Sequence, residues 1–152
     1  MKFVIQRVTE AQVDVNGATI GKIGKGFLVL IGVSREDNRA IADKLVKKLI
    51  GLRIFEDAEG KTNLSLADVG GSLLLVSQFT LYADTRKGNR PSFTKAGDPA
   101  ESQRLYELFV ERARRDVARV ETGEFGADMQ VALVNDGPVT IELCSDAKFP
   151  KA

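Results

Sequence analysis

The chain has 152 residues, with 22 basic and 21 acidic side chains and a formal net charge of +1. This length fits one domain with its own hydrophobic core. There is no histidine and one cysteine, Cys144. These counts exclude a Ser-His-Asp triad, a Cys-His dyad, a His-containing or multi-Cys zinc site and an internal disulfide. The charge balance excludes a basic field over the whole chain, so any contact with nucleic acid needs a local basic patch.

The sequence predicts neither a signal peptide nor a membrane span. Lys2 and Arg7 interrupt the apolar N-terminal stretch, which therefore lacks the apolar core of a signal peptide. No apolar run approaches the roughly 20 residues of a membrane-spanning helix. We therefore expect a cytoplasmic protein with no membrane segment.

Strands dominate the first part of the chain. Residues 2–15 alternate in part between apolar and polar side chains, and Asn16-Gly17 predicts a hairpin turn because both residues tolerate positive φ. Residues 18–25 would form the return strand. The continuous apolar run over residues 27–31 is typical of a strand that is buried on both faces.

A helix is predicted next, with Asp37 or Asn38 as its N-cap and Gly51 as its stop. One apolar stripe runs along it, formed by Ile41, Leu45 and Leu49. Residues 52–56 would form a short strand. Residues 57–71 are predicted to be a loop.

The second half of the chain is predicted to contain a strand, a helix and two final strands. A buried strand begins at Leu73 and is expected to continue to Tyr82, before a polar loop over residues 84–97. A helix begins after Asp98, with Pro99 at its first position. Its apolar side includes Leu105, Leu108 and Phe109. Two alternating strands follow, with a turn predicted at Asn135-Asp136-Gly137-Pro138.

This order of elements predicts an α/β fold: one domain with mixed β-sheets and two main helices in a layered arrangement. Two helices cannot cover both faces of so many strands. We therefore expect a remaining sheet face to pack on another sheet or on a second copy of the chain.

The first candidate site is Ser77-Gln78-Phe79-Thr80, at the end of a buried strand that feeds a loop. Alternation along a strand would place Ser77 and Phe79 on one face, and Gln78 and Thr80 on the other. A hydroxyl here could act as a nucleophile only with a base nearby. No base adjoins it in the sequence, and the structural alternative is that these hydroxyls bond to neighbouring backbone.

The second candidate is the loop over residues 85–95, which carries four basic side chains and no acidic one. The basic residues are Arg86, Lys87, Arg90 and Lys95, and Phe93 offers a stacking surface. Such a loop could hold phosphates, with a base stacked on the aromatic ring. The alternative is a solvated basic loop that acidic patches elsewhere balance.

The third candidate is Asn135-Asp136-Gly137-Pro138-Val139-Thr140. Proline after glycine removes one N–H group and makes a cis bond possible, although a plain turn is the commoner structure. The glycines over residues 21–26 match neither the P-loop nor the dinucleotide-binding motif, and the scattered aspartates do not form a metal motif.

Segments along nearly the whole chain carry a family resemblance. They are Gln6-Arg7-Val8, Gly24-Lys25-Gly26, Leu52-Arg53-Ile54-Phe55, Asn63-Leu64-Ser65, residues 77–85, Arg90-Pro91-Ser92-Phe93, Ala127-Asp128-Met129, Leu133-Val134 and residues 135–140. Together they resemble the D-aminoacyl-tRNA deacylase family, to which the pair Ser-Gln-Phe-Thr and Asn-x-Gly-Pro-x-Thr is specific. Thr62 departs from the methionine that is usual there. The resemblance predicts a deacylase domain over residues 1–145 and a C-terminal tail over residues 146–152.

The resemblance implies a homodimeric editing enzyme. No cofactor is expected, and no cluster of ligand residues in the sequence suggests a metal ion, although the sequence leaves metal assistance open. It would hydrolyse the ester that links a D-amino acid, or glycine mischarged on tRNA-Ala, to the 3′-terminal adenosine of tRNA. In this family the Gly-Pro bond is cis and enters the site of the other subunit, where Gly137 and Pro138 would crowd out an L side chain. Arg7 would brace this segment, and Met129 would lie on the pocket wall.

The resemblance also assigns Ser77, Gln78, Phe79 and Thr80 to the catalytic pocket, with backbone N–H groups that hold the substrate or the oxyanion. Thr80 could be the nucleophile, or the 2′-hydroxyl of the terminal adenosine could assist the reaction. We favour the RNA-assisted interpretation, because an isolated threonine hydroxyl is a poor nucleophile at neutral pH. In the basic loop, Arg86, Lys87 and Arg90 would hold acceptor-end phosphates, with Phe93 nearby.

Two alternatives stay open. Related folds occur as appended domains of tRNA synthetases, and relatives in higher cells have been linked to DNA binding, so a non-catalytic nucleic-acid-binding module is the second hypothesis. A structural dimer is the third. Release of amino acid from D-Tyr-tRNA but not from L-Tyr-tRNA would distinguish the enzyme from both.

Overall fold

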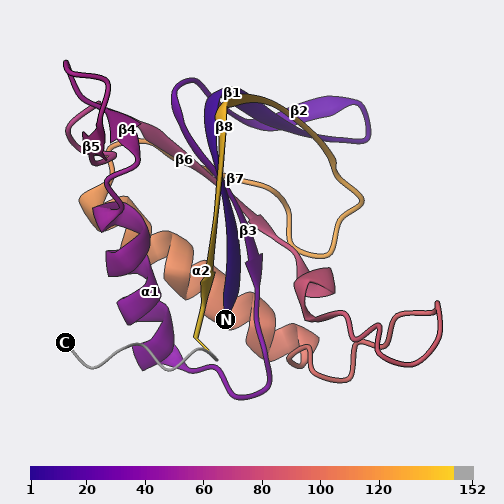
Figure 1. Ribbon diagram of the computed structural model, residues 1–152. Coiled ribbons are helices and arrows are strands. Elements are labelled where there is room, and N and C mark those ends of the chain that lie inside the picture. The colour runs from indigo at the N-terminus through magenta and orange to yellow at the C-terminus, as the bar shows by residue number, and fades with distance from the viewer. Residues whose placement is uncertain (146–152) are drawn as a thin grey trace.

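The computed structural model describes residues 1–145 of the chain (Figure 1), so the expected tail over residues 146–152 lies outside the described residues. In chain order the elements are β1 (Lys2–Val15), β2 (Ala18–Ile23), β3 (Gly26–Gly32), α1 (Arg39–Gly51), β4 (Phe55–Glu56), β5 (Thr62–Leu64), β6 (Ser72–Ser77), the 3-10 helix η1 (Phe79–Tyr82), α2 (Pro99–Asp116), β7 (Val120–Thr122) and β8 (Gln130–Cys144). The prediction of a mixed α/β domain with two main helices is confirmed.

The main sheet is mixed. Its strands run in the order β2-β1-β3-β6-β7, and β8 also pairs with β1. β1 is antiparallel to β2, β3 and β8, whereas β3, β6 and β7 are parallel. β4 and β5 form a small separate hairpin, seen at the upper left of Figure 1.

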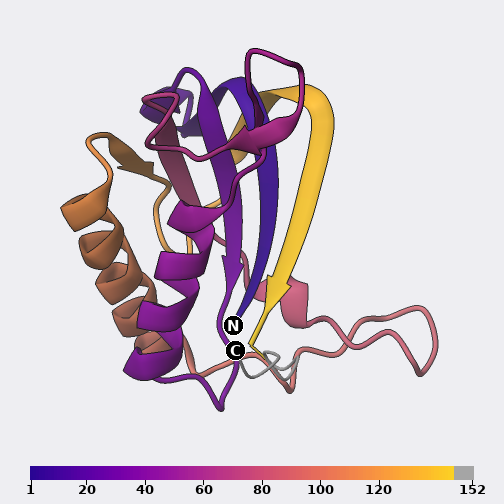
Figure 2. The same cartoon turned by 60° about the vertical axis from the view of Figure 1, so that its left-hand side comes forward.

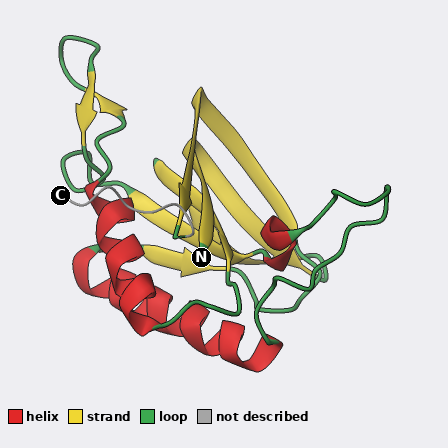
Figure 3. Cartoon of the chain, turned by 60° about the horizontal axis from the view of Figure 1, so that its bottom comes forward, coloured by secondary structure: helices red, strands yellow, loops and turns green. Residues whose placement is uncertain are grey.

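Both helices cover the same face of this sheet (Figure 3). The larger core lies between them and the sheet, and Phe3 of β1 meets Phe109 of α2 there with ring centroids 4.9 Å apart. A second core lies on the opposite face. It consists of Val8, Ala11, Val13, Ile23, Leu28, Leu74 and Val76. β3 is thus buried on both sides, as its continuous apolar run predicts.

The sheet curls until β2 also lies against β6 and β7, so that it is nearly closed. Gly21 of β2 makes this approach possible, because a Cβ atom at Gly21 would lie 2.6 Å from the carbonyl oxygen of Thr122. The second core fills the space inside the curl.

Local signals set both helix starts. Asn38 caps α1 by accepting a hydrogen bond from the N–H of Ile41 at 3.1 Å. Of the two N-cap candidates, Asn38 is therefore the cap. Gly51 was predicted to stop α1 but is its last helical residue. The predicted start of α2 is confirmed, because Asp98 accepts from the N–H of Glu101 at 3.3 Å. Among the described residues, no helix combines the length and apolar surface that a membrane crossing requires.

Three predicted elements are wrong. Residues 57–71 were predicted to be a loop, but Thr62–Leu64 within them form β5 by pairing with β4. The strand after Leu73 ends at Ser77, and Phe79–Tyr82 form η1, so alternation does not decide where these side chains point. The chain does not turn at residues 135–138 either. β8 continues through them, because β1 is long enough to pair with β8 on both sides of this segment, with register shifts between Gln6 and Glu10.

Candidate functional site

A cavity of about 280 Å³ opens where β6 ends and η1 begins. It is lined by Ile31, Val33, Val76, Ser77, Gln78, Phe79, Ser102, Tyr106, Phe125, Gly126, Ala127, Met129 and Val131. Four residues that the resemblance assigns to the pocket, Ser77, Gln78, Phe79 and Met129, therefore border one space. Ser77, Gln78 and Phe79 follow one another at the end of β6, whereas Met129 comes from the segment before β8, so the fold brings two separate parts of the sequence together.

The predicted catalytic segment follows the parallel part of the sheet. The N–H of Gln78 donates to the carbonyl of Ile31 at 2.7 Å, which fixes the end of β6 against β3. Phe79 and Thr80 then begin η1, and the first N–H groups of a helix have no partner inside that helix. Thr80 is exposed and is not among the cavity residues. Its Oγ1 accepts a hydrogen bond from the Gln78 side-chain amide.

Ser102, Tyr106 and Phe125 were missed from the sequence. Ser102 and Tyr106 lie one turn apart on the buried side of α2. A serine within the apolar side of this helix was the feature of the sequence that could have pointed to them. The Tyr106 hydroxyl donates to the carbonyl of Leu75 at 2.7 Å, and burial raises the pKa of Tyr106 to about 12. The ring of Phe125 lies 6.0 Å from that of Tyr106. Tyr106 therefore holds the cavity wall to the sheet as a neutral phenol.

A second hollow, of about 480 Å³, adjoins the first on the other side of Phe79. Phe79 and Phe93 border it and meet edge to face, with ring centroids 5.1 Å apart. Their exposed fractions are 58% and 37%, which is high for such large apolar side chains. The exposed aromatic pair thus stands between the cavity and the projecting loop over residues 84–97.

That loop extends away from the rest of the chain (Figure 2). Arg86, Lys87 and Arg90 are all exposed on it. The Arg86 guanidinium donates to Asp84 at 2.5 Å and 2.9 Å, and these hydrogen bonds hold the pKa of the Asp84 carboxyl well below its usual range. Arg86 is therefore already paired with an anion, whereas no ion pair is recorded for Lys87 or Arg90 among the described residues.

Arg7 and Gly137-Pro138 form a separate group on β1 and β8. Arg7 is 5% exposed and donates to the carbonyls of Ile54 at 2.6 Å and Asp136 at 3.0 Å. It also lies 3.5 Å from the Asp136 carboxylate. The Gly137-Pro138 bond is cis. Gly137 and Pro138 are exposed and do not line the cavity of their own chain.

The site therefore offers a small, largely apolar cavity beside backbone N–H groups at the start of η1, with exposed aromatic and basic side chains nearby. Such an arrangement can bind a small acyl group and stabilise an oxyanion, with nucleic acid outside. In the described part of the chain, no group of three or more His, Cys, Asp or Glu side chains is placed to hold a metal ion.

Comparisons with known proteins agree on one family. The model of the family "D-Tyr-tRNA(Tyr) deacylase" matches residues 4–144. A protein named "D-aminoacyl-tRNA deacylase" from Variovorax paradoxus is 59% identical over 143 residues, which are 94% of this chain and 98% of the relative. One with the same name from Thermosipho melanesiensis is 55% identical over 150 residues, 98% of this chain and 100% of the relative.

Two solved structures share the fold. One, described as "c-Myc DNA Unwinding Element Binding Protein", has a TM-score of 0.90 at 44% identity, over 95% of this chain and 99% of that chain. The other, described as a probable eukaryotic D-amino acid tRNA deacylase, has a TM-score of 0.79 at 20% identity, over 93% and 97%. The second supports the fold alone. With the family model and the curated relatives, these matches show that the chain belongs to the D-Tyr-tRNA(Tyr) deacylase family.

Proposed function

We propose that this chain hydrolyses the ester between a D-amino acid and the 3′-terminal adenosine of tRNA. The family match over residues 4–144 carries the proposal, and it makes the chain a hydrolase of ester bonds. The cavity of about 280 Å³ supports it, since this volume is near the lower end of ligand pockets and suits an aminoacyl group.

In the proposed reaction, water adds to the ester carbonyl and gives a tetrahedral oxyanion. The bond from carbon to the ribose 3′-oxygen then breaks, the ribose oxygen takes a proton, and free amino acid leaves. The N–H groups of Phe79 and Thr80 are the proposed oxyanion donors, because they begin η1 without intrahelical partners. Ser77, Gln78 and Met129 would hold the aminoacyl group in the cavity.

We propose RNA assistance in place of a Thr80 nucleophile. The recorded partner of Thr80 Oγ1 is the Gln78 amide, which donates a hydrogen bond and cannot take a proton. The terminal adenosine brings its own 2′-hydroxyl close to the ester. We expect Thr80→Ala to retain deacylation and a 2′-deoxy terminal adenosine to abolish it. Near-complete loss of activity in Thr80→Ala with tRNA binding intact would contradict this proposal.

We further propose that L-amino acids are excluded across a homodimer. Gly137 and Pro138 are exposed on β8, and the buried Arg7 donates to the carbonyl of Asp136, the residue directly before them. Leu133 and Val134 on the same strand are 36% and 48% exposed, which favours a second copy against this face. The Gly137-Pro138 segment of one subunit would then enter the cavity of the other. A site that selects by crowding an L side chain would also admit glycine, so glycyl-tRNA-Ala is a proposed second substrate.

For tRNA contact we propose Arg86, Lys87 and Arg90, with Phe93 as a neighbouring stacking surface. Their exposure on one projecting loop beside Phe79 supports this assignment. Binding should weaken as the salt concentration rises. If replacement of all three basic side chains by glutamine left tRNA affinity and its salt dependence unchanged, these contacts would be ruled out.

The deciding experiment incubates the protein with D-Tyr-tRNA, L-Tyr-tRNA and Gly-tRNA-Ala and follows the free amino acid. Release from the D-tyrosyl and glycyl substrates alone supports the proposed reaction with both proposed substrates. Release from D-Tyr-tRNA without release from Gly-tRNA-Ala supports the deacylase and removes the glycine substrate. No release, with tRNA still bound, supports the non-catalytic nucleic-acid-binding module, which the likeness to a DNA-element-binding protein keeps as the second candidate.

A further inference from the structure

The second hollow, on the other side of Phe79 from the cavity, has a buried serine hydroxyl on its border. Ser102 is 8% exposed and borders both the hollow and the cavity. Among residues 1–145 no hydrogen bond of its Oγ is recorded, although buried hydroxyls usually have a partner. A Cβ atom at Gly97, which borders the hollow and not the cavity, would lie 2.6 Å from this oxygen. The hydroxyl therefore lies on the side of the hollow, where a ligand could supply the missing partner.

The hollow also has an exposed aromatic wall. Phe79 and Phe93 border it with exposed fractions of 58% and 37%. Nucleobases have flat π-faces, and the stacking of a base on an aromatic side chain is a common means of holding single-stranded nucleic acid. The hollow thus combines a surface for a flat ring with a polar group for the edge of that ring.

The charges around the hollow favour a base over a phosphate. Three carboxylates and one guanidinium group border it, those of Asp37, Asp98, Glu101 and Arg35. This net negative charge would repel a phosphate, whereas a nucleobase is uncharged. The edge of a base carries hydrogen-bond donors and acceptors that such polar groups can meet.

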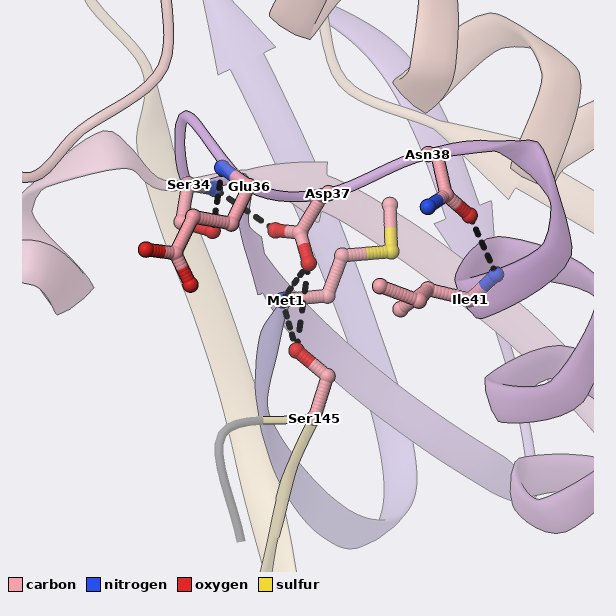
Figure 4. A network of polar contacts seen from close by, with 7 residues as sticks. All are labelled: Met1, Ser34, Glu36, Asp37, Asn38, Ile41 and Ser145. Carbon is pink, nitrogen blue, oxygen red and sulfur yellow. Dashed lines mark hydrogen bonds and ion pairs between the residues drawn. The ribbon is translucent and has the colours of Figure 1, made fainter. Parts of the chain in front are cut away.

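Two of the three carboxylates are already engaged. The Asp37 side chain is 1% exposed, and it accepts from the N–H of Ser34 at 2.7 Å and from the hydroxyl of Ser145 at 3.1 Å (Figure 4). Glu101 accepts from the Arg104 guanidinium at 3.0 Å. Neither carboxylate is therefore the first choice to meet a ligand in the hollow.

Asp98 is the carboxylate that can accept from a ligand. It is exposed at the start of α2, where its Oδ2 accepts from the N–H of Glu101 at 3.3 Å. In the described part of the chain no partner of its Oδ1 is recorded. A carboxylate oxygen accepts from an exocyclic amino group such as that of cytosine or adenine, whereas uracil presents a carbonyl oxygen at the same position. The hollow consequently suits a base that carries an amino group.

The path of the RNA decides which base reaches the hollow. This step rests on the proposed function, which places the ester carbonyl at the start of η1 and the acceptor-end phosphates on the loop at residues 86–90. The terminal adenosine stays with the ester, because its 2′-hydroxyl assists the reaction there. Phe79 and Phe93 stand between the cavity and the loop, so the preceding nucleotide has to cross the hollow. In tRNA, which ends in CCA, that nucleotide is a cytidine.

We propose that the second hollow is a subsite for the base of the cytidine that precedes the terminal adenosine. The cytosine ring stacks on Phe93, its amino group donates to Asp98, and the Ser102 hydroxyl donates to an acceptor on the same edge of the ring. This contact sets the position of the ester relative to η1. Since the cytidine is common to all tRNAs, the subsite works for acceptor stems of any sequence.

The test measures how tightly the full-length protein binds RNA hairpins that reproduce an acceptor stem and its single-stranded 3′ end. One hairpin ends in CCA and one in CUA. Two others end in CCA with either the penultimate or the terminal nucleotide abasic. We expect the dissociation constant to rise at least about 5-fold with the penultimate uracil and with the penultimate abasic nucleotide, because a hydrogen bond or a stacked base is lost.

Variants assign these effects to the hollow. Phe93→Leu keeps an apolar side chain without an aromatic face, so the loss caused by the penultimate abasic nucleotide should fall below about 2-fold. Asp98→Asn still caps α2 but can donate to uracil, so the loss caused by uracil should fall below about 2-fold. Ser102→Ala should weaken binding of the CCA hairpin at least about 3-fold. In the control Thr94→Ala, which changes an exposed neighbour of Phe93 that does not border the hollow, both losses should keep their wild-type size.

The outcomes separate this subsite from the proposed reaction. A loss below about 2-fold with the penultimate abasic nucleotide in the wild type would overturn the subsite, even where hydrolysis of D-Tyr-tRNA upholds the deacylase. If the effect of Phe93→Leu disappeared with the terminal abasic nucleotide instead, the hollow would hold the terminal adenine and the proposal would be wrong. Binding that depends on the cytosine, without hydrolysis of D-Tyr-tRNA, would support the subsite and contradict the proposed reaction.

Discussion

The exchange Arg7→Met tests how the Gly137-Pro138 segment is held. Methionine keeps an apolar stem in the buried space and removes the hydrogen bonds to the carbonyls of Ile54 at 2.6 Å and Asp136 at 3.0 Å. A hydrogen bond to a charged group contributes about 1.5–3 kcal/mol. The Asp136 contact counts for about half of that, because the Asp136 residue is partly exposed and its carbonyl can regain water.

The expected loss in the free energy of unfolding is therefore about 3 kcal/mol, or roughly 100-fold in the folding equilibrium constant. A domain of this size usually has about 5–15 kcal/mol of stability, so the variant should remain folded. The measurement is urea unfolding beside the control Arg53→Met. Arg53 is an exposed arginine that bonds to the carbonyl of Asn63 at 2.8 Å, and its loss should cost less than about 1 kcal/mol.

The same variant also has a selectivity readout. If Arg7 positions the segment that excludes L side chains, Arg7→Met should release tyrosine from L-Tyr-tRNA, and Arg53→Met should not. Unfolding free energies within about 0.5 kcal/mol of each other for the two variants would refute the assignment of Arg7 as the buried anchor.

Two further predictions concern the sheet and the cavity wall. Gly21→Ala should lower the free energy of unfolding by about 1–3 kcal/mol, because its Cβ would lie 2.6 Å from the Thr122 carbonyl oxygen. The control Gly51→Ala meets no atom outside its own helix and places alanine in α1, so it should not lower the free energy of unfolding in the same thermal assay. Because burial raises the pKa of Tyr106 from 10.0 to about 12, the folded state favours the neutral phenol, and stability should be lost as the pH rises through that interval. Tyr106→Phe should remove this alkaline loss; an unchanged pH dependence of unfolding would contradict it.

Local chemistry made both helices predictable. The caps Asn38 and Asp98 bond to N–H groups three residues away, so the sequence window that encodes each helix start is short. β7 has only three residues and gave no periodic signal. The turn at residues 135–138 was wrong for the opposite reason: four turn-forming residues are overridden by strand pairing to β1, which lies far away in the sequence.

Some residues of the candidate site could likewise be predicted from the sequence, and others could not. Ser77, Gln78 and Phe79 are contiguous and follow an apolar strand, so their proximity needs no tertiary information. Ser102 and Phe125 come from α2 and from the segment before β8, and only the packing of α2 on the sheet brings them to the cavity.

β8 has a further consequence for the behaviour of the protein in solution. It pairs with β1 along one side, so its other side is a free edge among the described residues, and free edges invite other chains to add a strand. Pro138 lacks the N–H that such an added strand would bond to, and the register shifts opposite it break the regular ladder. We therefore expect the Gly137-Pro138 segment, which is proposed to exclude L-amino acids, also to oppose open-ended aggregation along this edge of the sheet.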